Sequence, residues 1–452
     1  MMRLRAVSEW IRRELPELVD EHGVPGAQVA VLVDGEVVDA AAGVLNTVTG
    51  VPVTTDAVFQ IGSITKVWTA TLVQQLVNEG LLDLDRPLRE YLPEFHVADE
   101  AASATVTTRQ LLCHTAGFEG DLFTDTGSND DAVEKYVATL ADVVQLFPPG
   151  ERFSYCNSGY VVLGRLVEVL RGKPFNAVLR ECLITPLKLE HIATNIEEAI
   201  LERPAVGHLH VVPDEAVRPA PVWSLVPSNA PAGSTLAMRA RSLLGFVQMH
   251  LSDPSMDMMR QPQVTLPDMG VVCAHWGLGW MLFDYPGGTV IGHDGATLGQ
   301  SAFLRVVPEA GVALALLTNG GEGLPVSRAV FGHLLAELAG VELPALPVPP
   351  ADPQPVDADR VSGTYRATMV DQELSVDADG RAWLRTVPRT PEAKLVMPET
   401  AVVEVVQFRA DALITVEPQR GMHQTIGLLG SDPSGRVKFL YGGGRVTARM
   451  SG

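Results

Sequence analysis

Ser63 and Lys66 lie three residues apart, where apolar positions with helical spacing begin and continue to Gly80. On a helix this spacing places both side chains on one face. A serine becomes a nucleophile when a nearby base takes its proton, and a lysine with a lowered pKa can be that base. A serine that caps the helix beside an ordinary lysine is the alternative. Of the six lysines, only Lys66 has a serine three residues before it, which favours the catalytic interpretation.

Two further short motifs contain groups that could assist such a nucleophile. Tyr-Cys-Asn at 155–157 follows the turn FPPGERF and precedes an expected helix, and its phenol could relay a proton. His-Asp-Gly at 293–295 lies within a predicted strand, where glycine often marks the close approach of a ligand or another backbone. Taken singly, the first is also compatible with ordinary loop chemistry and the second with a glycine-rich bend.

Composition excludes several classes of function. The formal net charge is −20 and no stretch gathers Lys or Arg, which argues against nucleic acid or an anionic membrane as partner. The charged, amphipathic N-terminus has no apolar signal region, and no apolar run is long enough to span a membrane. The four cysteines are scattered, without metal-ligand spacing, and no cofactor motif is present. We therefore expect a cytoplasmic protein without metal or cofactor, and its oligomeric state stays open.

The elements that must position these residues follow from periodicity and turn signals. Residues 27–44 predict a β-hairpin around an Asp-Gly turn. Helices are expected at 107–113, 130–146, 158–171, 236–251 and 325–339, and a strand-rich stretch at 275–320. Strands, then helices, then strands again favour an α+β fold with an antiparallel sheet flanked by a helical region.

A proline-rich stretch divides the chain. Residues 343–360 contain six prolines and predict a semi-rigid linker. Residues 361–452 consist of short alternating runs separated by turns, which is typical of a small all-β barrel or sandwich. The expected organisation is a catalytic domain at 1–342, the linker, and a β domain at 361–452.

Together and in this order, Ser-x-x-Lys, Tyr-x-Asn and His-x-Gly resemble the three-part signature of serine β-lactamases and penicillin-binding proteins. The stretches LLDLDRPLREYLPE (81–94), TTRQLLCHTAGF (107–118) and LTNG (317–320) are similar to that superfamily as well, and the likeness covers roughly residues 20–340. It is nearer to the β-lactamase-like esterase and D-peptidase branches than to secreted penicillinases. The resemblance implies the β-lactamase fold with Ser63 as nucleophile.

The same resemblance assigns roles to the other residues. Lys66 with Tyr155 would handle the proton, and which of them is the base stays open. Asn157 would hydrogen-bond a substrate amide. The backbone N–H groups of Ser63 and Ala296 would form the oxyanion hole, in which one donor typically contributes about 3 kcal/mol.

Several residues depart from the penicillinase pattern or have a second explanation. His293 stands where penicillinases have a lysine, and Asp294 adds negative charge, so we expect weak or no β-lactamase activity. Gly233 would lie in a wall of the substrate pocket, although a bend with Ser234 capping a helix explains the same stretch. His114 is expected to be structural, and the acidic segment 118–136 to lie over the cleft.

One branch of the superfamily combines a His-x-Gly motif with a C-terminal lipocalin-like domain: the penicillin-binding-protein-type thioesterases. Membership would imply that the chain accepts a peptidyl thioester from a nonribosomal peptide synthetase and closes it head to tail. Arg445 or Arg449 would then hold a peptide carboxylate. A β-lactamase-like hydrolase of small esters or peptides is the alternative, and a catalytically inactive binding protein is the third.

Overall fold

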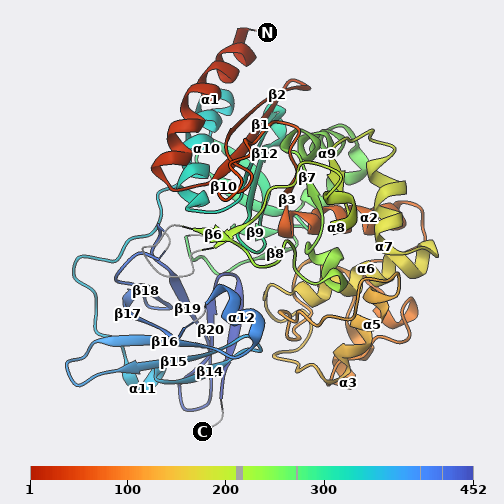
Figure 1. Cartoon of the computed structure of the whole chain (residues 1–452). Helices are drawn as coiled ribbons and strands as arrows, with labels where there is room; N and C mark the ends of the chain where they lie inside the picture. Colours follow the sequence, from red (N-terminus) through yellow and green to blue (C-terminus); the bar gives the residue numbers. More distant parts are fainter. Residues whose placement is uncertain (1, 210–216, 271–272, 398, 420, 451–452) are drawn as a thin grey trace.

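The computed structural model describes residues 2–209, 217–270, 273–397, 399–419 and 421–450. It consists of a sheet-and-helix unit and a closed β-barrel formed by the C-terminal part of the chain, drawn in blue in Figure 1. This confirms the predicted α+β β-lactamase-type fold with an all-β, lipocalin-like C-terminal domain. Among the described residues, no helix is long and apolar enough to cross a membrane.

The central sheet is antiparallel, with strand order β2-β1-β13-β12-β11-β10-β9-β8. Its hairpin forms as predicted, because Asp34 and Gly35 both adopt the positive φ angles that a tight two-residue turn requires. The strands are β1 (Gly26–Val33), β2 (Glu36–Gly43), β8 (Val264–Thr265), β9 (His275–Trp276), β10 (Met281–Tyr285), β11 (Gly288–Ala296), β12 (Ser301–Val307) and β13 (Val312–Thr318).

Both faces of this sheet are covered by helices, and its strands β1 and β13 are buried at every position. Val29 and Val31 of β1 belong to the core beneath α1 (Met2–Glu21) and α10 (Gly323–Ala339). Ala30 and Leu32 of the same strand belong to the opposite core, which includes α2 (Thr65–Asn78) and α9 (Ala240–Ser252). The period-two alternation of strand side chains thus divides one sequence run between two cores.

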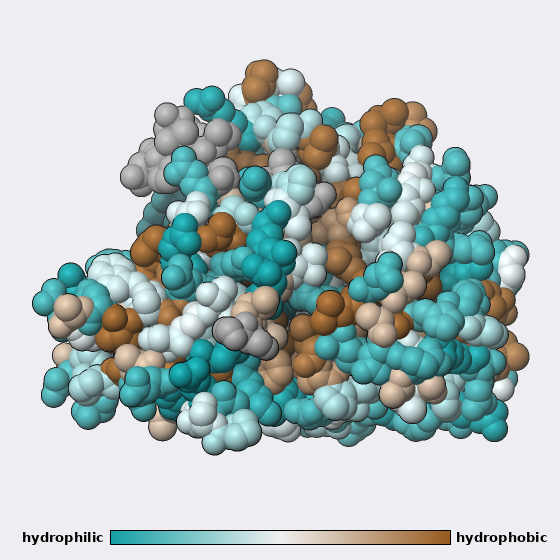
Figure 2. All heavy atoms as spheres, turned by 90° about the horizontal axis from the view of Figure 1, so that it is seen from below, coloured by the Kyte–Doolittle hydropathy of each residue, from teal (hydrophilic) through white to brown (hydrophobic). Residues whose placement is uncertain are grey.

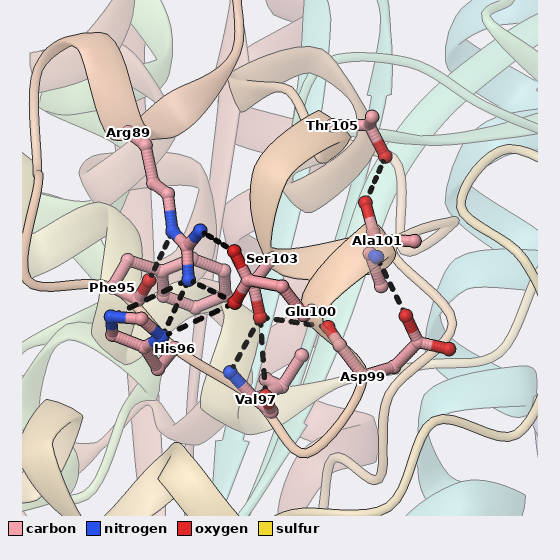
Figure 3. A network of polar contacts seen from close by, with 10 residues as sticks. Arg89, Phe95, His96, Val97, Asp99, Glu100, Ala101, Ser103 and Thr105 are labelled. Carbon is pink, nitrogen blue, oxygen red and sulfur yellow. Dashed lines mark hydrogen bonds and ion pairs between the residues drawn. The ribbon is translucent and has the colours of Figure 1, made fainter.

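A helical region next to the sheet holds the segment that leads to the second motif (Figure 1). Its helices are α3 (Glu100–Thr105), α4 (Thr108–Leu112), α5 (Ala132–Ala138), α6 (Asn157–Arg171), α7 (Phe175–Leu179) and α8 (Ile196–Ala199). Arg89 fastens the chain before α3, because its guanidinium contacts Glu100 at 2.6 Å and donates to the carbonyl of Phe95 at 2.9 Å (Figure 3). Asp99 caps α3 by accepting the N–H of Ala102.

Two predicted helices are shorter than expected. In place of 130–146, α5 ends at Ala138 and one 3₁₀ turn follows. The carbonyls of Val143 and Val144 instead accept N–H groups from Ala98 and Glu119, so backbone pairing with distant segments replaces the helix. In place of 236–251, α9 begins only at Ala240. The preceding β7 (Ala237–Met238) pairs with β3 (Phe59–Gln60) and β4 (Ile192–Ala193).

Residues 341–357 contain no helix or strand, and a short helix, α11 (Ala358–Val361), lies at the end of the predicted linker range. The barrel is closed by pairing of β14 with β21. Its strands are β14 (Gly363–Arg366), β15 (Val370–Val376), β16 (Ala382–Pro388), β17 (Ala401–Arg409), β18 (Ala412–Thr415), β19 (Thr425–Ser431), β20 (Val437–Gly442) and β21 (Arg445–Arg449), with α12 (Pro391–Val396) between β16 and β17. The small pair β5 (His208–Leu209) and β6 (Arg218–Pro219) completes the strands.

Candidate active site

Ser63 lies in a single 3₁₀ turn, Gly62–Ile64, immediately before α2. No side chain caps α2, so Ser63 does not have the capping role that was its alternative explanation. Lys66, one turn further along, is fully buried and its Nζ lies 3.0 Å from Ser63 Oγ. The same Nζ donates to the carbonyl of Ala232 at 2.6 Å, which fixes its position beside the serine.

The surroundings of Lys66 favour its uncharged form. Burial lowers its pKa well below the usual value, and the Arg445 guanidinium lowers it further, while Asp121 and Cys156 oppose the shift. A neutral amine has a lone pair that can take the Ser63 proton across the 3.0 Å separation. The sequence could show the spacing of the pair, but the burial that sets its proton affinity comes from the fold.

The ring of Tyr155 lies near two basic side chains that come from different domains. Lys66 Nζ is 4.9 Å and Arg445 Cζ is 4.7 Å from its centroid, and His114 stacks on the ring with a centroid distance of 4.2 Å. Burial raises the pKa of Tyr155, partly opposed by the Ser63 hydroxyl and by Arg445. The phenol therefore stays protonated at neutral pH and is suited to relay a proton rather than to be the resident base.

His114 supports Tyr155 from behind. It has a positive φ of 57°, and its Nδ1 accepts the backbone N–H of Cys156 at 2.9 Å. Burial lowers the pKa of His114 well below its usual value, so the imidazole is neutral and stacks on the Tyr155 ring. These contacts agree with the structural role expected for this residue.

Asn157 is connected to the barrel through a residue that the sequence did not single out. Its Nδ2 donates to Asp121 Oδ1 at 2.6 Å, and Asp121 in turn pairs with Arg445 Nε at 2.5 Å. Asp121 belongs to the acidic segment 118–136 that was expected over the cleft. Nothing in the spacing of that segment distinguishes Asp121 from its other carboxylates, so only the fold identifies it.

Two glycines bring three backbone segments together around Ser63. A Cβ on Gly295 would lie 2.0 Å from the carbonyl oxygen of Ile61, and one on Gly233 would lie 2.1 Å from that of Gly62. Any side chain there would push the strand or the wall away from the serine. The backbone of Ala296 follows Gly295 and lines the same cavity as Ser63, as the proposed oxyanion hole requires.

Ser234 does not cap a helix, as the alternative explanation of this stretch supposed. Its hydroxyl is buried without a hydrogen-bond partner among the described residues, and the helix α9 begins six residues later, at Ala240. Gly233, directly before it, has a φ of 113° and lies in the pocket wall.

The third motif holds a neutral histidine and a compensated carboxylate. Burial and the nearby Lys66 lower the pKa of His293 to about 3, and its Nδ1 contacts the carbonyl of Asp294 at 2.6 Å. Asp294 forms two contacts with the Arg305 guanidinium, at 2.6 and 3.0 Å. The Arg305 guanidinium on the neighbouring strand therefore compensates the negative charge that Asp294 adds. The motif offers no cation to a substrate carboxylate.

Of the two arginines considered on the last strand, Arg445 reaches the site and Arg449 does not. Arg445 lines the cavity and keeps 40% of its side chain exposed. Arg449 donates to the carbonyls of Ser362 and Arg360, at 2.7 and 3.1 Å, and so fastens the barrel closure.

The predicted site residues meet at one pocket of about 500 Å³, with Lys66 buried behind Ser63. The pocket is lined by Ser63, Tyr155, Asn157, Gly233, His293, Gly295, Ala296 and Arg445. Aromatic side chains of Phe123, Phe153, Trp276 and Phe303 make much of the remaining wall, and barrel residues 443–445 close one side. Hydrophobic groups are also visible on the lower face of the molecule (Figure 2). Within the described ranges, no group of three His, Cys, Asp or Glu could hold a metal ion.

Comparison with known proteins agrees with this geometry. A model of the beta-lactamase family matches residues 11–337. The chain belongs to the beta-lactamase family. Penicillin-binding protein 4 of Amycolatopsis lactamdurans is 45% identical over 359 residues, which cover 76% of this chain and 94% of that protein.

Solved structures extend the likeness to the barrel. SurE superimposes with a TM-score of 0.78 at 30% identity, over 98% of this chain and 99% of its own. A second SurE structure contains D-Leu and gives a TM-score of 0.75. D-amino acid amidase from Ochrobactrum anthropi SV3, complexed with L-phenylalanine amide, has a TM-score of 0.60 at 25% identity, over 70% of this chain and 92% of its own. The amidase likeness covers a smaller share of this chain than the SurE likeness does, and the family assignment places the chain among β-lactamase-like serine hydrolases.

Proposed function

We propose that this chain is a serine thioesterase that takes a peptidyl thioester onto Ser63 and releases it by head-to-tail cyclisation. The observation that carries the proposal is the site assembled by two domains. A nucleophile and base pair, Ser63 and Lys66, faces a pocket that the barrel completes with Arg445. The substrate is a peptide with a free N-terminal amine, and its thiol is a pantetheine arm, either free or on a carrier protein of a nonribosomal peptide synthetase.

In the first half of the reaction, neutral Lys66 takes the Ser63 proton while Oγ attacks the thioester carbonyl. The N–H groups of Ser63 and Ala296 stabilise the oxyanion. The C–S bond breaks, and the thiolate leaves with the proton returned through Lys66 and Tyr155. In the second half, the peptide's own amine attacks the acyl-serine ester. The amine loses its proton to Lys66, Ser63 regains one, and the released product is a lactam.

Asn157 and Arg445 are proposed to hold the substrate. The Asn157 side chain lines the pocket, where it can face a substrate amide. Its Nδ2 donates to Asp121, which holds the side chain in place. Arg445 is paired with Asp121, so a substrate carboxylate or carbonyl would bind to the part of the guanidinium that remains exposed.

A D-configured residue at the acyl position is part of the proposal. It is supported by the SurE structure that contains D-Leu and by the likeness to the D-amino acid amidase. The amidase likeness also favours a second candidate function, hydrolysis of D-peptides or small esters, in which water replaces the amine. The aromatic wall of the pocket supports cyclisation, because an apolar enclosure limits the water available to attack the acyl-enzyme.

The test uses the full chain and a hexapeptidyl N-acetylcysteamine thioester with a free amine and a C-terminal D-leucine. Mass spectrometry should find a product that has lost the thiol and gained no water. Ser63→Ala should abolish thiol release, whereas Ser252→Ala, at the distant end of α9, should not. Linear acid alone would establish the hydrolase instead, and thiol release that is unchanged in Ser63→Ala would refute both.

A further inference from the structure

The barrel contains a second cavity, of about 610 Å³, which is within the range that holds small-molecule ligands. Its wall includes residues two apart on three consecutive strands: 370 and 372 on β15, 384 and 386 on β16, and 401 and 403 on β17. Because strand side chains alternate, residues two apart point to the same face. These positions therefore form the inner face, and the cavity is the lumen of the barrel.

This lumen adjoins the pocket at Ser63. Five residues line both cavities, namely Tyr155, Gln424, Thr425, Gly443 and Arg445. The catalytic domain contributes residues 119–121 to the lumen wall. Glu119 secures this contact by accepting the backbone N–H of Thr368 at 2.9 Å and its hydroxyl at 2.6 Å. A molecule attached to Ser63 can thus extend past Arg445 into the barrel.

The chemistry of the lining selects what the lumen accepts. Among its described residues, the acidic and basic side chains are Glu119, Asp121 and Arg445, all where the two domains meet. Asp121 and Arg445 pair with each other, and Glu119 is bonded to Thr368. The remainder of the barrel lining consists of aliphatic side chains such as Leu384 and Val403 with neutral hydroxyls and amides. Such a surface favours an uncharged, largely apolar group with a few hydrogen-bonding atoms.

We infer that the lumen is the specificity compartment for the part of the acyl peptide remote from the reacting residue, and that it takes an uncharged, mainly apolar side chain. This rests on the proposed function, because the occupant is the peptide esterified to Ser63. The lumen then determines which peptides are accepted, while the pocket at Ser63 reads only the residue that reacts.

Adjacent residues of β17 provide a matched pair of variants. Val403 lines the lumen, whereas Val402 is 55% exposed on the outside of the barrel. We would compare Val403→Trp and Val402→Trp on two thioesters that end in the same D-residue, an acyl-dipeptide and a hexapeptide with apolar side chains. Filling the lumen should lower kcat/KM for the hexapeptide about tenfold or more and leave the dipeptide nearly unchanged. Val402→Trp should change neither.

The outcomes separate the two proposals. If the wild-type chain turned over neither thioester, the proposed function would be refuted. The lumen could still be tested by calorimetry of hexapeptide amide binding to Ser63→Ala, because adding Val403→Trp to that variant should weaken the binding. Equal effects of the two tryptophan variants, or equal losses on both substrates, would overturn the inference. Thr386→Leu fills less of the same lumen and replaces Val403→Trp if the latter does not fold. It should also affect the hexapeptide selectively.

Discussion

Replacing Arg445 by glutamine should raise the pKa of Lys66 and slow acylation of Ser63 at pH values below the midpoint of the wild-type profile. Arg445 Cζ and Lys66 Nζ lie 4.7 and 4.9 Å from the Tyr155 ring centroid, so the two cations are less than about 10 Å apart. At an effective dielectric constant of about 20 and a separation of about 10 Å, the repulsion between the two charges is roughly 1.7 kcal/mol. Because 40% of the Arg445 side chain is exposed, solvent screening reduces this repulsion to about 1.4 kcal/mol, which corresponds to a tenfold change in rate.

The sign follows from the role of Lys66. The base works when it is neutral, above its pKa, and Arg445 lowers that pKa. In Arg445→Gln, the pH at which acylation reaches half its maximum should therefore move up. The rate well below the wild-type midpoint should fall about tenfold, while the plateau at high pH is retained when the thioester is saturating. The assay is the burst of thiol release from the thioester, followed by stopped flow from pH 6 to 10.

Two further variants distinguish this electrostatic effect from loss of binding. Asp121 raises the pKa of Lys66, so Asp121→Asn in addition to Arg445→Gln should bring the midpoint back toward that of the wild type. Arg385→Gln removes an exposed barrel arginine whose side chain is paired with Glu373, and should leave the profile unchanged. A uniform fall at every pH, with the midpoint unmoved, would refute the reasoning and leave Arg445 as a binding group only.

Three other expectations concern the third motif. Gly295→Ala should lower kcat about a hundredfold or more, because the added Cβ would meet the Ile61 carbonyl. Gly288→Ala, on the same strand, should leave kcat unchanged. Steady-state kinetics on the folded variants measures both effects. The wild-type chain should turn over a chromogenic cephalosporin at no more than trace rates, because His293 is neutral at every physiological pH; brisk absorbance change would contradict this. Arg305→Met should lower the free energy of unfolding in urea by about 1–3 kcal/mol by leaving Asp294 unpaired, and an unchanged midpoint would show that the pair contributes nothing.

The sequence was most informative where local periodicity and tertiary structure agree. The hairpin at 27–44 forms because its Asp-Gly pair adopts the positive φ angles that the turn requires. The helices α6 and α10 each bury an apolar face. The helix predicted at 130–146 failed after Ala138 because distant backbone groups compete for its carbonyls. Such pairing between segments that are remote in sequence does not alter the local periodicity of apolar residues, so the sequence pattern could not predict it.

The site shows the same division. Ser63, Lys66, Tyr155 and Asn157 could be named because their types and order form a known signature. Asp121 could not, because its importance comes from two contacts, to Asn157 and to Arg445, that only the packing of barrel against catalytic domain creates. The choice between Arg445 and Arg449 likewise required the barrel register.

The distribution of the site along the chain has a consequence during protein synthesis. Ser63, Lys66 and Tyr155 leave the ribosome early, but Arg445 is carried by the strand that closes the barrel. At about 5–20 residues per second, synthesis needs on the order of 15–60 s to pass from Tyr155 to Arg445. A nascent chain therefore holds its nucleophile before the cation that helps to activate Lys66 has arrived. A fluorophosphonate probe should label Ser63 weakly on chains stalled before residue 445, so translation order itself delays the chemistry until the barrel is in place.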